Sequence, residues 1–75
     1  DFTINHYAFK VDDNSFEDIY GKIKNEEIIY GSDPYDLENM QINHWHEGRG
    51  LYFRDPNGHI LEILTRTEDD QIHGN

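Results

Sequence analysis

Two apolar runs separated by the turn sequence Asp-Pro-Asn-Gly constrain the fold of this chain more than any other feature. The runs span residues 50–54 and 59–65 and are rich in leucine, isoleucine and aromatic residues. Pro56 presets the backbone of the second turn position, Asn57 suits the third, and Gly58 suits the left-handed position after a type I turn. The pattern therefore predicts a β-hairpin whose loop ends in a bulge at Gly58.

The register of this hairpin isolates one carboxylate. If Asp55 closes the loop opposite His59, then Tyr52 lies opposite Glu62. Side chains alternate between the two faces of a strand, so Glu62 shares its face only with apolar neighbours of its own strand. A carboxylate in such surroundings is costly unless another group pairs with it. The rest of the sequence should therefore contain its partner.

Length and cysteine content limit how this chain can be stabilised. It has 75 residues and no cysteine, which allows at most one small domain and no disulfide. A chain this short buries only about 60% of its unfolded surface. We expect a metal, a second copy of the chain, or further parts of a longer chain to supply the missing stability. The start at Asp1 favours a processed or truncated chain.

The charge of the chain argues against two classes of partner. The formal net charge is −10, and the six Lys and Arg residues are scattered. Nucleic acids and anionic membranes are poor partners for such a surface, whereas metal cations are better ones, although simple solubility explains the charge equally well. No apolar run approaches the roughly 20 residues of a membrane span, and the given sequence contains no signal peptide, although a cut before Asp1 would also remove a targeting segment. We therefore expect a cytoplasmic location.

The beginning of the chain reads as a strand with two different faces. Residues 3–11 are β-branched and aromatic, which predicts a β-strand. Tyr7 and Phe9 share the face that should meet a helix. His6 and Lys10 share the opposite face, which must meet something else.

A helix and weaker elements follow this strand. Its candidate caps are Asp12, Asp13, Asn14 and Ser15. Apolar residues then recur at helical spacing and predict one buried stripe, made of Phe16, Ile19, Tyr20 and Ile23. The helix should end at Asn25.

The segment between the helix and the hairpin is less regular. Residues 27–30 are predicted as a short strand, 31–38 as a polar loop, and 40–45 as a bent strand or the return of that loop. We expect residues 1–66 to form a single βαβββ module of the α+β class, and residues 67–75 to form a polar tail.

The face of the sheet away from the helix gathers the residues that can carry chemistry, namely His6, Lys10, Tyr52, Arg54 and Glu62. His6 and Glu62 lie 56 positions apart, each in an otherwise apolar strand. Imidazole and carboxylate together suit Zn, Fe(II), Mn, Ni or Co. Two ligands do not complete a metal site, and a hydrogen-bonded or half-exposed pair is the simpler interpretation of the spacing alone.

Four residues are candidate substrate contacts. Arg49 and Arg54 can hold a substrate carboxylate, although pairing with surface acids is equally consistent with the sequence. Tyr52 can donate to a metal-bound oxygen, or it can simply pack. Lys10 shares the face of His6 and can also extend into solvent.

Other histidines have simpler explanations. His44 and His46 share a face if their segment is a strand, but a loop edge or the mouth of a pocket fits them better than a metal site. His59 follows the hairpin turn, where a role in the turn is the better interpretation.

Segments 5–13 and 50–63, with the helix between them, resemble the C-terminal module of the vicinal oxygen chelate superfamily. That superfamily includes glyoxalase I, bleomycin resistance proteins and extradiol dioxygenases. The resemblance covers roughly residues 3–66, and the strand-turn-strand segment with Glu62 is its most specific part. It implies a βαβββ module that pairs with another around a divalent metal. The implied metal ligands are His6 and Glu62, and the shared chemistry is chelation by vicinal oxygens of a small substrate.

The resemblance leaves the activity open. A missing first module, or a second copy of this chain in a homodimer, would supply the remaining ligands. Glu62 would act as the base in a glyoxalase-type isomerase, whereas His6 and Glu62 would complete a triad for Fe(II) in a dioxygenase. Acids at positions 68–70 argue against the fosfomycin-modifying transferases, which carry a basic residue in this region. The alternative is a metal-free module that sequesters a small molecule.

Overall fold

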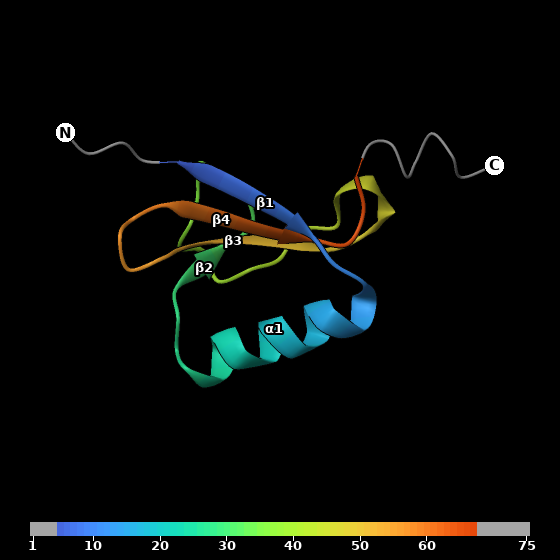
Figure 1. Cartoon of the computed structure of the whole chain (residues 1–75), viewed down its shortest axis with the longest axis horizontal. Helices are drawn as coiled ribbons and strands as arrows, with labels where there is room; N and C mark the ends of the chain where they lie inside the picture. The colour runs from blue at the N-terminus through green and yellow to red at the C-terminus, as the bar shows by residue number, and fades with distance from the viewer. Residues whose placement is uncertain (1–4, 68–75) are drawn as a thin grey trace.

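The computed structural model describes residues 5–67 of the chain, and these form one sheet covered on one face by a helix (Figure 1). The elements, in order, are β1 (His6–Lys10), α1 (Asp13–Asn25), β2 (Tyr30–Gly31), a short 3-10 helix η1 (Trp45–Glu47), β3 (Gly50–Arg54) and β4 (Ile60–Leu64). The four strands are ordered β1-β4-β3-β2. The predicted βαβββ module of the α+β class is therefore confirmed.

The β3–β4 hairpin has the register that its turn sequence predicts. The two strands pair antiparallel, with Tyr52 opposite Glu62. The backbone N–H of Asp55 donates to the carbonyl of His59 (3.0 Å), and Gly58 adopts a φ of 88°. The Asp55 carboxylate also accepts a hydrogen bond from the His59 N–H (2.9 Å), which adds a side-chain clamp to the turn.

β1 lies beside β4, so the first and last strands of the sheet are neighbours. They pair in parallel, and Ala8 lies opposite Glu62 while His6 lies opposite Ile60. Residues opposite one another share a face, so His6 and Glu62 both lie on the face away from α1, here called the open face. The strand begins at His6 rather than at Thr3, and residues 3 and 4 lie outside the described part, as do residues 68–75 of the expected tail.

Helix α1 is capped and terminated as its sequence suggests. Asp12 is the N-cap, and its carboxylate accepts a hydrogen bond from the Ser15 N–H (2.7 Å). That bond keeps the pKa of Asp12 below its usual value. The apolar stripe packs against the sheet in a buried core of Phe16, Ile23, Tyr30, Leu51 and Ile63. Among the described residues, none of the helices is long and apolar enough to cross a membrane.

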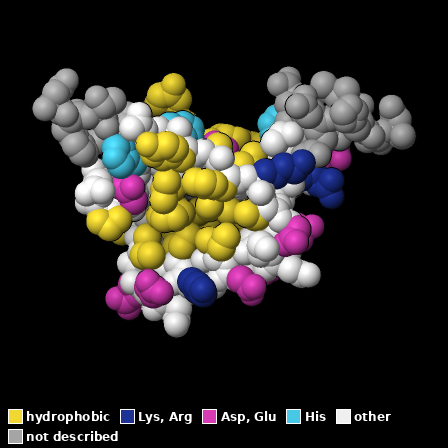
Figure 2. All heavy atoms as spheres, in the orientation of Figure 1, with side chains coloured by type: hydrophobic (Ala, Val, Ile, Leu, Met, Phe, Trp, Pro, Cys, Tyr) yellow, Lys and Arg dark blue, Asp and Glu magenta, His cyan; other side chains and the backbone are white. Residues whose placement is uncertain are grey.

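One expectation about β1 is wrong. Tyr7 and Phe9 do lie on the helix side of the sheet, but their exposed fractions are 45% and 51%. The core instead joins α1 to Leu51 of β3, Ile63 of β4 and Tyr30 of β2, which leaves the outer strand uncovered. Figure 2 shows hydrophobic side chains gathered on the face of the molecule that carries β1 and reaches down to α1.

The segment before β3 is less regular than predicted. β2 comprises only Tyr30 and Gly31, because Glu27 follows the helix with a left-handed φ of 58° and cannot start a strand. Residues 40–45 return along the sheet without forming a strand, with a single bridge between Asn43 and Gly50. A Cβ on Gly31 would lie 1.9 Å from the carbonyl oxygen of Asp36, so glycine is needed for this loop to cross so closely.

Candidate metal centre

His6 and Glu62 meet on the open face. The Nε2 atom of His6 lies 3.2 Å from Oε1 of Glu62, although the residues are 56 positions apart in the chain. The glutamate side chain is mostly buried, with 13% exposure, whereas the histidine side chain is 45% exposed. The carboxylate that the sequence isolates thus has an imidazole beside it, and the imidazole has a face turned toward solvent.

Tyr52 completes the immediate surroundings of Glu62. Its ring centroid lies 5.6 Å from that of His6, and its hydroxyl hydrogen-bonds to the Glu62 carboxylate. Burial, and then this hydrogen bond, raises the pKa of Tyr52 well above its usual value. The hydroxyl is therefore protonated at neutral pH and donates to the carboxylate, which fixes the orientation of Glu62.

The donor chemistry of this pair fits part of a metal site. A neutral imidazole nitrogen and a carboxylate oxygen are ligands that divalent transition metals accept. Within residues 5–67, no group of three or more His, Cys, Asp or Glu side chains is placed to hold an ion. The described part of the chain therefore offers two donors, and a complete coordination sphere needs others from outside it.

Arg49 lies away from this pair. Its guanidinium binds the carboxylates of Glu17 and Asp13 on α1, the latter at 3.4 Å, and lies 4.7 Å from the centroid of the Phe16 ring. The bond to Glu17 raises the pKa of Arg49. Arg49 thus joins the start of β3 to α1, which is the pairing with surface acids that the sequence also allowed, and its contact with substrate stays a prediction.

Lys10 and Arg54 belong to the open face but lie toward its ends. Lys10 is opposite Leu64, and Arg54 is opposite Ile60 at the hairpin end. The side chain of Arg54 lines a groove whose other walls are Glu27, Ile28, Ile29, Leu37 and Glu38. Both residues lie on the same face of the sheet as Glu62, on either side of it.

Trp45 lies beside Tyr52 and was not among the candidate site residues. Its ring centroid is 6.1 Å from that of Tyr52, at an interplanar angle of 62°. The signal in the sequence is that the chain has a single tryptophan, and that it lies in a polar segment between His44 and His46. His59, by contrast, has the predicted role in the turn, since its N–H donates to the Asp55 carboxylate (2.9 Å). Its Nδ1 also accepts the N–H of Asn5, just before β1, at 3.0 Å.

No family model matches the chain. Metallothiol transferase FosB of Shouchella clausii is 32% identical over 67 residues, which are 89% of this chain and 42% of that protein. The solved structure of Oxidase ChaP-H2 is 50% identical with a TM-score of 0.83, and the match covers 88% of this chain and 52% of that one. The fosfomycin resistance protein FosX from Mesorhizobium loti is 25% identical with a TM-score of 0.61, over 96% of this chain and 52% of that one.

The chain belongs to the vicinal oxygen chelate superfamily. It spans about half the length of the relatives that it matches. Those members of the superfamily are named a transferase, an oxidase and a resistance protein, so membership alone does not specify a reaction. The expectation that acids at positions 68–70 argue against a transferase is not supported, because metallothiol transferases are among the relatives of this chain. Those acids lie outside the described residues.

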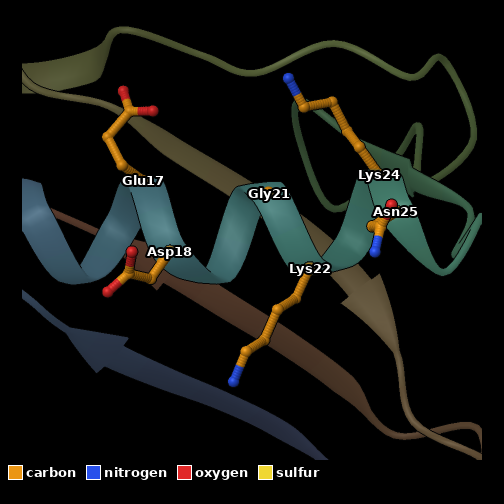
Figure 3. A pocket seen from close by; sticks show the side chains of 6 residues that line it. All are labelled: Glu17, Asp18, Gly21, Lys22, Lys24 and Asn25. Carbon is orange, nitrogen blue, oxygen red and sulfur yellow. The ribbon is translucent and has the colours of Figure 1, made fainter.

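A second concave region lies on the outer side of α1, away from the open face. It is lined by Glu17, Asp18, Gly21, Lys22, Lys24 and Asn25 (Figure 3). The charged side chains splay outward along the helix, and the gap lies at Gly21, where a Cβ would meet nothing within 4 Å. Because these groups do not converge on one point, we place the candidate site on the open face.

Proposed function

We propose that this chain forms half of a divalent metal site that binds vicinal oxygens of a small substrate. The observation that carries the proposal is the 3.2 Å approach of His6 Nε2 to Glu62 Oε1 on the open face. Nothing local in the sequence brings these atoms together, because they belong to the first and last strands of the sheet. Their chemistry matches an ion that accepts both nitrogen and oxygen ligands, such as Zn, Fe(II), Mn, Ni or Co.

The residues of the open face would have different roles. His6 and Glu62 would hold the ion, which when bound supplies Lewis-acid chemistry at the substrate oxygens. Tyr52 orients the Glu62 carboxylate through its hydroxyl, and the same protonated group can donate to a substrate oxygen. Glu62, beside the Tyr52 hydroxyl, would also act as the general base. Lys10 and Arg54 would contact parts of the substrate farther along the sheet.

A second module would supply the remaining ligands. The chain spans about half the length of its relatives, and its described residues offer two donors. β1 is an edge strand of the sheet and carries the half-exposed Tyr7 and Phe9, so it is the surface that we propose for pairing. The partner is either another copy of this chain or a preceding module of a longer one.

Metal binding tests the proposal directly. Calorimetric titration with each candidate divalent metal should show tight binding that both His6→Ala and Glu62→Gln abolish, whereas Tyr52→Phe should weaken it by about 10- to 100-fold. Matched controls are His59→Gln, which removes an imidazole from the turn, and Glu26→Gln, which removes a carboxylate at the end of α1. Both controls should bind metal like the unmodified protein.

The same titration separates the two functions that the sequence allows. If His6→Ala and Glu62→Gln retain full metal affinity with an intact fold, the proposed site is wrong. If the unmodified protein binds none of these metals, a metal-free module that sequesters a small molecule becomes the better description.

A further inference from the structure

Three aromatic rings form a row beside Glu62 on the open face. The ring of His6 lies 5.6 Å from that of Tyr52, which lies 6.1 Å from that of Trp45. Tyr52 in the middle is buried, with 4% exposure, whereas Trp45 at the end keeps 46% of its surface exposed. The row therefore leads from the candidate metal ligands to a large apolar ring that is open to solvent.

The backbone that carries Trp45 is held in place by buried polar contacts. Asn43 is 8% exposed, and its backbone exchanges two hydrogen bonds with Gly50 of β3 (2.8 and 3.0 Å). Its amide nitrogen donates to the carbonyl of Ser32 (2.8 Å), and its amide oxygen accepts the N–H of Trp45 (3.3 Å). Through Asn43, the position of Trp45 is therefore tied to the sheet and to the start of the loop.

The residues after Trp45 adopt an uncommon conformation. His46 and Glu47 have φ values of 58° and 64°, which place both in the left-handed region. Consecutive non-glycine residues rarely adopt this region, and such backbone gathers at functional sites. The chain turns back into β3 immediately afterwards, so this geometry sets where the indole lies relative to Tyr52.

We propose that Trp45 is a ligand-contact residue, whose indole packs against a flat apolar group attached to the chelating oxygens of the substrate. This inference rests on the proposed function, because it takes Glu62 and His6 as the point where those oxygens bind. The T-shaped contact with Tyr52 leaves 46% of the Trp45 surface exposed for a further ring, and aromatic groups prefer such offset or edge-to-face neighbours. Trp45 then selects among substrates that share the same pair of oxygens.

Two hydroxamic acids can distinguish a contact between Trp45 and a substrate ring from chelation of the metal. Benzohydroxamic acid and acetohydroxamic acid present the same vicinal oxygens, but only the first carries a flat ring. With the Zn-loaded full chain, we expect the first to bind about tenfold more tightly by calorimetry. It should also change the tryptophan fluorescence, which reports on Trp45 alone because the chain has one tryptophan.

Substitutions assign that preference to the indole. Trp45→Leu should lower the affinity for benzohydroxamic acid about tenfold and leave that for acetohydroxamic acid unchanged, while Trp45→Phe should keep most of the preference. Tyr35→Leu is the matched control, because Tyr35 is an aromatic residue of the same loop that is 97% exposed. It should leave both affinities unchanged. Trp45→Phe also guards against a folding defect in the leucine variant.

Each contrary result has a distinct meaning. If both acids bind through the metal but Trp45→Leu leaves their affinity ratio unchanged, the inference is wrong and the proposed function stands. Equal weakening of both acids, or a changed oligomeric state with an unchanged ratio, also overturns the contact and points to a role in holding the site or in module pairing. If neither acid binds in a metal-dependent way, the proposed function fails and the inference fails with it.

Discussion

Gly58 holds the hairpin turn in a backbone conformation that favours glycine. Its φ of 88° lies where a Cβ is strained, so Gly58→Ala should lower the free energy of unfolding by roughly 1–2 kcal/mol. Gly21→Ala makes the same chemical change within α1, where a Cβ meets nothing within 4 Å. That variant should be more stable by up to about 1 kcal/mol. Urea denaturation measures both changes.

Opposite signs at these two glycines would tie the effect to backbone conformation. A neutral Gly58→Ala would mean that the turn has another geometry, and the alignment of Tyr52 with Glu62 would then lose its basis. The conformation of Gly58 therefore bears on the site, since a register shift of one residue would move Glu62 to the helix side of the sheet.

At the scale of elements, Arg49 joins helix α1 to the sheet. Its guanidinium lies over Phe16 and binds Glu17 and Asp13, so one side chain combines ring packing with two ion pairs. Arg49→Met keeps part of the packing and removes the charge, and should cost about 1 kcal/mol in unfolding free energy. Arg49→Ala should cost more, because it also uncovers the ring. Arg54→Met, at the far end of β3, is the control for loss of an arginine elsewhere in the sheet.

The stability effects of the two Arg49 substitutions should depend on salt in different ways. The difference in unfolding free energy between Arg49→Met and the unmodified protein should shrink at high salt. Glu17 and Asp13 are exposed, so their attraction to Arg49 is screened. The further loss in Arg49→Ala should persist, because ring packing is not screened. If Arg49→Met is as stable as the unmodified protein at low salt, the ion pairs contribute nothing to the docking of α1.

At the scale of the whole molecule, the uncovered β1 edge predicts association. We expect sedimentation equilibrium to show a dimer of the chain, and Phe9→Lys to shift it toward monomer, because a lysine on an edge strand opposes pairing. The control is Tyr35→Lys, which places the same charge at a side chain that is 97% exposed on the loop. It should leave the dimer intact. A stable, cooperatively folded monomer of the unmodified chain would contradict the prediction.

Association and metal binding should then be coupled. If a second copy supplies the remaining ligands, metal should bind the dimer and raise its stability, as any ligand of an assembled state does. Phe9→Lys should therefore weaken metal affinity although Phe9 lies on the face away from His6 and Glu62. Metal affinity that is unchanged in the monomeric variant would place the missing ligands elsewhere.

Local sequence patterns predict the features that depend on neighbours along the chain. The hairpin register follows from the turn residues around Gly58, and the end of α1 follows from Asn25. The sequence limits the cap of α1 to four neighbouring residues, of which Asp12 is the one used. The assignment of His6 and Glu62 to one face follows from alternation in two strands. Each of these is set by backbone conformation within a few residues, which is why local patterns suffice to predict it.

Which of these parts meet depends on the folded chain as a whole. It placed β1 beside β4, which turned a shared face into the 3.2 Å contact between His6 and Glu62. It also drew Arg49 to α1 and brought Trp45 next to Tyr52. Such contacts depend on the path of a loop and on packing between residues far apart in the chain, and neither periodicity nor turn chemistry encodes them.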